Sequence, residues 1–232
     1  MKEYLKDLNL TEEQIDKLCI FAQDVLEANK SFNLTAITDE IEFAYKHIID
    51  SLSPIGNVEG FGKSGQRVID VGTGAGFPGI PLAIALPEVK FTLTDSLAKR
   101  LAFIDGEVEK LGLKNVNTIH ARAEDLAHDE KAREKYDFVV SRAVANLSTL
   151  LEYDTPFIHK NGELIAYKSS EVDDEIMQAK NALKLLNAEI SSFYEYSLGE
   201  NMGNRKLLII KKLSTTPKQF PRKAGTPSKK PL

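Results

Sequence analysis

The chain contains little cysteine and no long apolar run, and both shortages exclude classes of protein. Cys19 is the only cysteine among 232 residues, which excludes an internal disulfide and a multi-cysteine zinc site and fits a reducing compartment. No uninterrupted apolar run is long enough to span a bilayer, and Met1–Asp7 carries no apolar signal core. We therefore expect a cytoplasmic protein with no membrane partner, and the sequence indicates no metal site.

Acidic residues are missing from one end of the chain. Residues 211–232 contain seven lysines and arginines and no Asp or Glu, which leaves 23 basic and 34 acidic residues, a net charge of −11, in residues 1–210. A basic end on an acidic body is typical of a protein that binds a polyanion, although a solvated, disordered end explains the same charges. Four prolines keep residues 214–232 out of any β-sheet, so we expect the body to fold and to bind a cofactor without this tail.

The most informative stretch is a glycine-rich turn between a predicted strand and a predicted helix. Asp70-Val71-Gly72-Thr73-Gly74-Ala75-Gly76 follows a β-branched run and precedes the apolar residues 77–86. Glycine allows a sharp turn and lets a ligand approach the main chain. The start of the helix adds unpaired N–H groups and a positive dipole end. This arrangement predicts a nucleotide-type pocket.

Two cofactors fit this turn, and a turn without a ligand is the third interpretation. Gly74, Gly76 and Gly79 match the dinucleotide fingerprint. The alternative places the strand end at Gly72 and gives Asp-x-Gly-x-Gly-x-Gly. Proline at positions 78 and 81 removes backbone N–H groups that a pyrophosphate needs. S-adenosylmethionine has no phosphate, and its sulfonium and ammonium suit the Asp70 carboxylate. We therefore favour S-adenosylmethionine.

Strands and helices alternate along most of the chain. Helices are predicted at 11–29, 39–52, 79–86, 97–111, 146–157 and 171–186, and strands at 67–71, 90–94, 116–120, 137–141, 163–168, 189–196 and 206–212. This alternation predicts an α/β, Rossmann-like fold with a seven-stranded, mostly parallel sheet and helices on both faces. No helix separates the last two strands, so the last strand should run antiparallel. We divide the chain into an N-terminal helical extension (1–64), a Rossmann-like domain (65–213) and the tail (214–232).

The carboxyl ends of parallel strands are where ligands bind in such a sheet. Strand two ends at Asp95 and Ser96, where an acid can accept hydrogen bonds from both ribose hydroxyls. The same acid also fits as a helix cap and could serve as both, and Ser96 is the expected N-cap of the helix that follows. Ala123 and Glu124 follow strand three, where the adenine amino group is expected. Arg142 and Lys168 end strands four and five and suggest an anionic substrate.

Two sequence features that other methylation reactions require are absent near the predicted pocket. No Asn/Asp-Pro-Pro-aromatic sequence for methylating an exocyclic amine follows strand four, and no cysteine for covalent attack on a pyrimidine lies nearby. A guanine N7 has a free lone pair and no proton, so it needs neither device and requires mainly positioning.

Several motifs in this order resemble the bacterial RsmG family, also called GidB. They are the turn itself with its continuation Phe77-Pro-Gly-Ile-Pro-Leu-Ala, Thr94-Asp-Ser-Leu-Ala-Lys-Arg, Arg122-Ala-Glu, Ser141-Arg-Ala, Ala166-Tyr-Lys168, Asn33-Leu-Thr35, His47-Ile-Ile-Asp-Ser51 and the tail from Arg222. The resemblance implies a class I, S-adenosylmethionine-dependent methyltransferase that acts on N7 of a guanine in the 530 loop of 16S ribosomal RNA. The implied partner is this RNA in the small subunit or its precursor, with no DNA expected.

The resemblance also implies site residues. Cofactor contacts fall at Gly72, Phe77, the segment Asp95, Ser96 and Leu97, the pair Ala123 and Glu124, and Arg142; Asp70, Gly74 and Gly76 shape the methionine end of the pocket. On the substrate side the candidates are Arg142, Lys168, Asn33, Thr35, His47 and Asp50, and no general base is assigned. Two other functions stay open at this point: a nicotinamide-dependent oxidoreductase, and a ribosome-associated RNA-binding module with a vestigial pocket.

Overall fold

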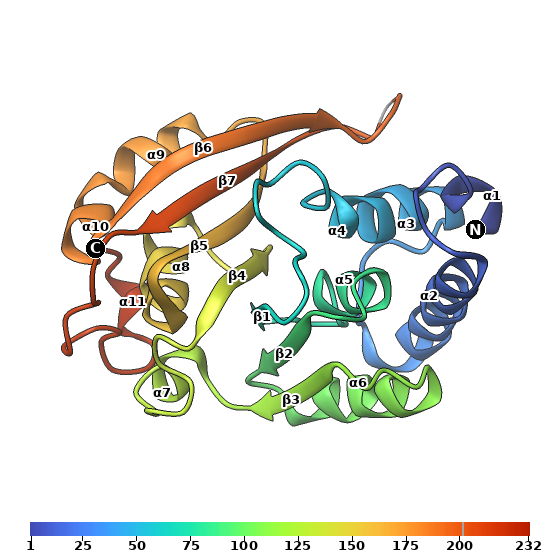
Figure 1. Cartoon of the computed structure of the whole chain (residues 1–232), viewed down its shortest axis with the longest axis horizontal. Coiled ribbons are helices and arrows are strands. Elements are labelled where there is room, and N and C mark those ends of the chain that lie inside the picture. The colour runs from blue at the N-terminus through green and yellow to red at the C-terminus, as the bar shows by residue number, and fades with distance from the viewer. Residues whose placement is uncertain (201) are drawn as a thin grey trace.

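A computed structural model of the chain describes residues 1–200 and 202–232. Its seven strands form one sheet in the order β3-β2-β1-β4-β5-β7-β6 (Figure 1). The strands are β1 Arg67–Val71, β2 Lys90–Asp95, β3 Val116–His120, β4 Tyr136–Arg142, β5 Ile158–Ser169, β6 Ala188–Ser197 and β7 Asn204–Lys212. Strands β1 to β5 pair in parallel, and β7 lies antiparallel between β5 and β6. The predicted sheet, including its antiparallel last strand, is confirmed.

The helices also follow the predicted ranges, with local differences. They are α1 Lys2–Leu5, α2 Glu12–Phe32, α3 Glu40–Phe43, the π-helical turn η1 Ala44–Ile49, α4 Asp50–Leu52, α5 Gly79–Ala85, α6 Ala98–Lys110, α7 Ala123–Leu126, α8 Leu147–Asp154, the 3-10 turn η2 Thr155–Phe157, α9 Asp173–Gln178, α10 Lys180–Leu185 and α11 Thr226–Lys229. The predicted helix 39–52 is continuous through α3, η1 and α4, whereas 171–186 is interrupted at Ala179. None of the helices in the described residues combines the length and the apolar character that crossing a bilayer requires.

One predicted helix cap is wrong. Ser96 does not cap α6; Leu97 precedes the helix, and its N–H donates to Asp95 Oδ1 at 2.8 Å. The carboxylate two residues earlier reaches this amide because it closes a short Asx-type turn. Asp95 therefore holds the start of α6 in place of the serine.

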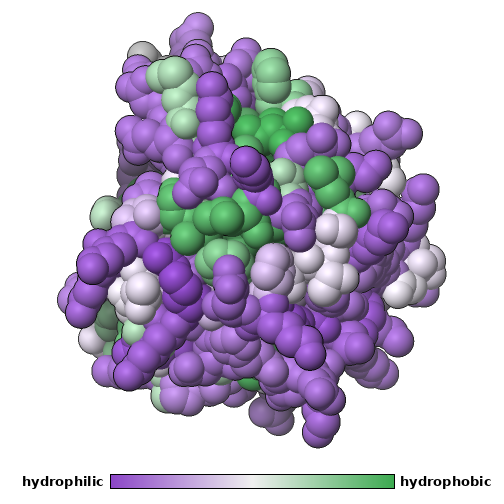
Figure 2. Space-filling model, turned by 90° about the vertical axis from the view of Figure 1, so that its left-hand side faces the viewer, coloured by the Kyte–Doolittle hydropathy of each residue, from purple (hydrophilic) through white to green (hydrophobic). Residues whose placement is uncertain are grey.

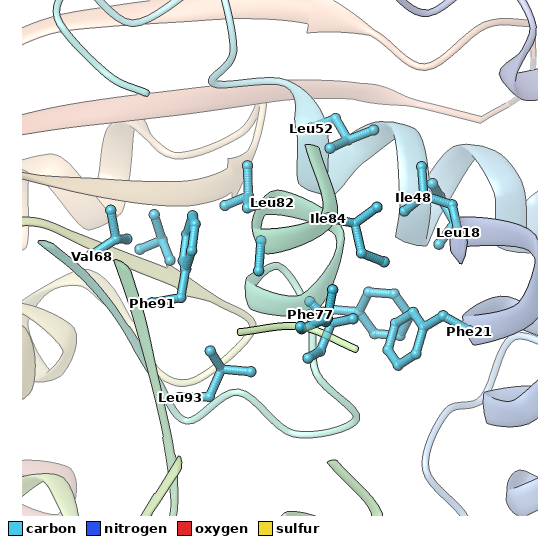
Figure 3. Close-up of a cluster of buried hydrophobic side chains, with 14 of the residues drawn as sticks. Leu18, Phe21, Ile48, Leu52, Val68, Phe77, Leu82, Ile84, Phe91 and Leu93 are labelled. Carbon is cyan, nitrogen blue, oxygen red and sulfur yellow. The ribbon is translucent and has the colours of Figure 1, made fainter. Parts of the chain in front are cut away.

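Side chains alternate along the strands, so the sheet buries an apolar face on each side. Val68, Phe138 and Ile165 belong to one buried cluster, together with residues of α2, η1, α4 and α5, while Ile69 and Val139 belong to a second cluster under α8, α9 and α10. Figure 3 shows part of the first cluster, where Phe77 after the glycine turn lies next to Phe21 of α2. The N-terminal helices thus rest on the sheet through the residue that follows the turn.

The C-terminal tail packs against the body, a contact that the sequence did not indicate. Residues 214–232 do not join the sheet, as expected, but Phe220 is 4% exposed and Thr216 is fully buried. Arg133 donates to the carbonyls of Thr216 and Phe220, and Thr149 of α8 donates to that of Pro227. The tail and α11 run beside α8 in Figure 1. Figure 2 views the end of the molecule where the C-terminus lies, a mostly hydrophilic face around an apolar patch. The tail is therefore part of the packed structure, and folding of the body without it stays a prediction.

Candidate functional site

The glycine turn is organised from beneath by Asp70. Asp70 Oδ2 accepts hydrogen bonds from Thr73 Oγ1 at 2.7 Å and from the Gly79 N–H at 2.8 Å, and the side chain is fully buried. A Cβ at Gly79 would lie 2.7 Å from Oδ2, so only glycine fits there. Burial raises the pKa of Asp70 to about 7 against the lowering effect of these two hydrogen bonds. The carboxylate therefore fixes the turn to α5 and lines neither of the cavities described below.

Backbone amides of the turn, apart from that of Ala75, are occupied within the described part of the protein. Gly74 N–H donates to Asp95 Oδ2 at 3.0 Å, and other donors of the turn bond to Asp70 or to the carbonyls of Thr73 and Thr94; these donors are Gly72, Thr73, Gly76, Phe77 and Gly79. A pyrophosphate bound at a helix N-terminus needs such amides free. This geometry favours a ligand without phosphate, as the two prolines of the sequence indicated.

A cavity of about 340 Å³ opens at the carboxyl ends of β1, β2 and β3, and we call it the loop cavity. It is lined by Val71, Gly72, Thr94, Asp95, Ser96, Arg100, Ala121, Arg122, Ala123, Glu124, Ala143, Val144, Tyr153, Gly225 and Ser228. Asp95 is 5% exposed, and each of its carboxylate oxygens already accepts one backbone N–H, from Gly74 or from Leu97. Asp95 Oδ2 also accepts a hydrogen bond from Arg100 Nη1 at 3.5 Å. A carboxylate oxygen has two acceptor positions, so Asp95 Oδ1 retains capacity for one hydroxyl donor.

The structure brings together only part of the predicted cofactor set in the loop cavity. Gly72, Asp95, Ser96, Ala123 and Glu124 line it. The other six do not. Asp70 lies beneath the turn, and Arg142 lines the second cavity described next. Gly74 holds Asp95, Gly76 packs near Ile80 and Phe21, Phe77 is buried among aromatic rings, and Leu97 is 52% exposed beside the start of α6.

A second cavity, of about 360 Å³, shares Ala143 and Val144 with the first, and we call it the arginine cavity. It is lined by Ile37, Lys46, His47, Asp50, Ser141, Arg142, Ala143, Val144, Ala145, Leu150, Tyr167, Lys168, Ser169 and Arg205. Arg142, at the end of β4, donates to Asp50 Oδ2 at 2.7 Å, and its guanidinium lies 5.3 Å from the centre of the Phe77 ring. Tyr196 donates to the other oxygen of Asp50 at 2.7 Å. Arg142 thus ties η1 and α4 to the sheet.

His47 is held as a neutral ring by partners on both nitrogens. Arg142 Nη2 is a donor only and lies 3.2 Å from Nδ1, so Nδ1 accepts and Nε2 carries the proton toward Thr35 Oγ1, 2.7 Å away. The ring stacks on Phe77 with centroids 4.6 Å apart. Burial, with the nearby Arg142 charge, lowers the pKa of His47 to about 3. His47 therefore orients Arg142 and has no free nitrogen for proton transfer.

The remaining substrate-side candidates divide into two groups. Lys168 lines the arginine cavity, and its ammonium donates to Glu175 Oε2 at 2.6 Å and to the Ala145 carbonyl. Thr35 supports His47 from outside the cavity. Asn33 is exposed and caps α2 in the left-handed conformation, so it lies apart from both cavities. The amide that acts nearby is Asn29, whose Oδ1 accepts the Thr35 N–H at 2.8 Å.

Several cavity residues were not identified from the sequence. Arg205 reaches the arginine cavity because β7 pairs with β5 in the register Ser169↔Arg205, while Tyr167 reaches it from β5 itself. A basic residue at the start of a strand does not indicate which strand will lie beside it. Gly225 and Ser228 reach the loop cavity through the packing of the tail, which the proline content gave no reason to expect.

Comparisons with known proteins agree with this geometry. The family model described as GidB, rRNA small subunit methyltransferase G, matches residues 14–206. The chain belongs to this family. It is 47% identical over 226 residues to ribosomal RNA small subunit methyltransferase G of Desulfitobacterium hafniense, which covers 97% of this chain and 92% of that protein. The protein of that name in Acetivibrio thermocellus is 45% identical over 97% of this chain and 91% of its own length.

Solved structures of more distant proteins share the fold of this GidB-family chain. TYW2 from M. jannaschii in complex with AdoMet has a TM-score of 0.53 at 13% identity, over 70% of this chain and 74% of that chain. TrmN from Thermus thermophilus has a TM-score of 0.54 at 15% identity, over 70% and 48%. At such identities the likeness shows the fold alone, which is the class I methyltransferase fold.

Proposed function

We propose that this chain transfers a methyl group from S-adenosylmethionine to small-subunit ribosomal RNA, at N7 of a guanine in the 530 loop of 16S RNA. The family match and the full-length relatives support rRNA methylation and give no support to an oxidoreductase. One observation carries the proposal: a loop cavity at the strand ends, lined by the buried acids Asp95 and Glu124 together with two arginines, adjoins a cavity with four basic side chains at Ala143 and Val144. A cationic cofactor and an anionic polymer need such neighbouring sites.

The loop cavity fits S-adenosylmethionine. Asp95 Oδ1 retains an acceptor position for a ribose hydroxyl, and Glu124 and Ala123 lie where the adenine is expected. The turn amides, which a phosphate would require, are already bonded apart from that of Ala75. Gly72 brings bare backbone to the cavity wall, where an added Cβ would lie 2.9 Å from Val144. These residues would hold the cofactor with its methionine end toward the shared wall.

The arginine cavity fits an RNA nucleotide. Arg142, Lys46, Lys168 and Arg205 place four cationic groups around it, with Tyr167 among the lining residues. Phosphate contacts with such groups supply most of the sequence-independent affinity for RNA. The tail adds exposed lysines at 218, 223, 229 and 230, whereas Arg222 is paired with Glu152 and is not available. We assign the arginine cavity to the target nucleotide and its phosphates.

The reaction requires positioning more than proton transfer. When bound, the cofactor supplies an electrophilic methyl group; the N7 lone pair forms the new bond to carbon, and the pair of the broken methyl–sulfur bond stays on sulfur. No proton leaves N7, so no general base is needed, and both nitrogens of His47 are engaged with Arg142 and Thr35. The contribution of this chain is therefore to align and dehydrate the two reactants. Arg142, fixed by Asp50 and His47, is our candidate for orienting the base.

Methylation of defined substrates tests the proposal. Purified protein is incubated with methyl-labelled cofactor and with small subunits, or naked 16S RNA, from a strain that lacks the gene, and the label is mapped by mass spectrometry. We expect one modified guanine in the 530 loop, carrying the methyl on N7, and no label in DNA. Label at another position would overturn the assigned specificity. RNA binding without cofactor binding would instead favour the RNA-binding module with a vestigial pocket.

A further inference from the structure

The last part of the tail is fastened to α8 by a buried acid. Glu152 is fully buried, and its carboxylate accepts three kinds of donor from Arg222: the backbone N–H at 2.7 Å, Nε at 2.9 Å and Nη2 at 2.6 Å. A bidentate pair of this kind fixes direction as well as distance. Arg222 Nη2 also donates to the Lys230 carbonyl at 2.7 Å, which closes the following residues into a loop. We call residues 220–232 the strap.

Beyond this anchor the strap reaches the loop cavity. Gly225 N–H donates to Glu124 Oε1 at 2.8 Å, and Glu124 itself is 6% exposed. Thr149 Oγ1 donates to the Pro227 carbonyl at 3.1 Å, and Pro227 is buried against α8. Between and after these contacts, Gly225 and Ser228 line the cavity with Tyr153 of α8. In Figure 1 the strap, with α11, lies next to α8 and on the side of α7.

We propose that the strap is a wall of the cofactor site, in which Gly225 and Ser228 contact the adenine side of the cofactor and Arg222 acts as the positioning residue. The inference rests on the proposed function, because it assigns the loop cavity to the cofactor. The Gly225 amide fixes the direction of the Glu124 carboxylate, and the Arg222–Glu152 pair fixes Gly225. The sequence indicated the basic tail only as an RNA contact, and in this proposal the strap also completes the loop cavity that holds the cofactor.

The wall is tested by a matched pair of exposed substitutions. Ser228→Trp places a large ring at a lining position, while Lys229→Trp places the same ring one residue further on, outside the lining residues. Both side chains are exposed, so both variants should fold. Calorimetry with S-adenosylhomocysteine as the probe should show Kd raised at least about tenfold for Ser228→Trp and within about twofold of wild type for Lys229→Trp. Equal affinities of Ser228→Trp and wild type for the probe would overturn the proposal that the strap is a wall of the cofactor site.

The anchor is tested by a second matched set. Arg222→Ala removes the side-chain partner of Glu152, Gln219→Ala removes an exposed, uncharged side chain just before the strap, and Arg222→Lys restores one donor. Cofactor KM should rise several-fold for Arg222→Ala, with partial rescue by lysine, no change for Gln219→Ala, and kcat at saturating cofactor within about twofold. A merely structural role would lower the amount of active enzyme and kcat while leaving KM unchanged, and that result would overturn the positioning role.

Failure of the inference is distinguishable from failure of the proposed function. If the wild-type protein does not bind the probe, the cofactor assignment itself is wrong. If wild type and Ser228→Trp bind the probe equally, the cofactor assignment stands and the strap is only a structural segment. The Ser228→Trp comparison keeps its meaning even if Arg222→Ala fails to fold.

Discussion

The two cavities meet at one wall but are built in opposite ways. The loop cavity takes most of its lining from the ends of β1, β2 and β3 and from α7, and its acids hold backbone amides. The arginine cavity collects side chains from η1, α4, β4, β5 and β7, and its cations are held by acids and carbonyls. The buried acids Asp95 and Glu124 thus lie on one side of the wall, with Arg100 and Arg122, and most of the cationic side chains of the arginine cavity lie on the other, with Asp50.

The shared wall is the segment that follows β4. Ala143 there adopts φ 57°, a conformation that residues other than glycine rarely adopt. The turn lets Arg142 face the arginine cavity while Val144 contacts the space above Gly72. Strained backbone between two sites is typical of positions where the surrounding structure determines a functional geometry. The comparison of the cavities predicts that each can be damaged without the other.

Arg142→Ala should give the largest effect and should damage the arginine cavity alone. Methyl transfer should fall by at least about 100-fold because the target base loses its orienting group. The free energy of unfolding should fall by about 3 kcal/mol, since Asp50 is 4% exposed and loses its closest charge partner. Single-turnover transfer and urea unfolding measure these changes, with Arg142→Lys as the conservative control. A loss of cofactor affinity in a folded Arg142→Ala protein would place this residue in the cofactor site instead.

Asp95→Ala should damage the loop cavity alone. Loss of a charge-assisted hydrogen bond to the ribose should weaken cofactor binding by about 1.5–3 kcal/mol. Turnover at saturating cofactor and the affinity for RNA should change little, which calorimetry and filter binding measure. Asp125→Ala, an exposed acid next to Glu124 that does not line the cavity, is the control. If saturated turnover falls while cofactor affinity is normal, Asp95 acts on the substrate side.

The smallest effect is a pair of opposite pH dependences, one from Asp70 beneath the glycine turn and one from His47 in the arginine cavity. Asp70 has its pKa raised to about 7, so between about pH 4 and pH 7 the folded state binds a proton that the unfolded state releases. Stability therefore falls as pH rises through this window. His47 has its pKa lowered to about 3, so below pH 6.5 the unfolded state binds a proton that the folded state excludes, and stability falls as pH falls. In wild type the two effects partly cancel.

Two variants separate these effects. Asp70→Asn keeps an acceptor for Thr73 and Gly79, and removes the group that loses stability at higher pH. Urea unfolding at pH 5 and pH 6.5 should then show a stability change that is more positive than that of wild type by about 2 kcal/mol, because the Asp70 contribution is removed while those of His47 and Glu107 are common to both proteins. His47→Gln should show the opposite trend, with stability decreasing over the same interval. Parallel pH curves for wild type and Asp70→Asn would contradict the burial argument for Asp70.

Local patterns in the sequence were enough to predict the strands, most helices and the turn. Residues 67–71, 116–120 and 79–86 are recognised because apolar spacing, glycine and proline act over a few neighbouring residues. Asp95 and Glu124 were found by the rule that ligands bind at the carboxyl ends of parallel strands, which needs only the strand order. The sequence by itself therefore determined the sheet and one side of the site.

Tertiary structure decided what no local pattern contains. The contacts of Arg142 with Asp50 and His47 join residues more than 90 positions apart, and those of Arg222 with Glu152 join residues 70 apart. Such pairs depend on which elements become neighbours, because a side chain reaches only a few ångströms from its backbone. The same limit explains why Asp70 was assigned to the cofactor yet lies beneath the turn, and why a basic tail became part of a cavity wall. Spacing along the chain predicts what a segment forms, whereas packing decides which surface it faces.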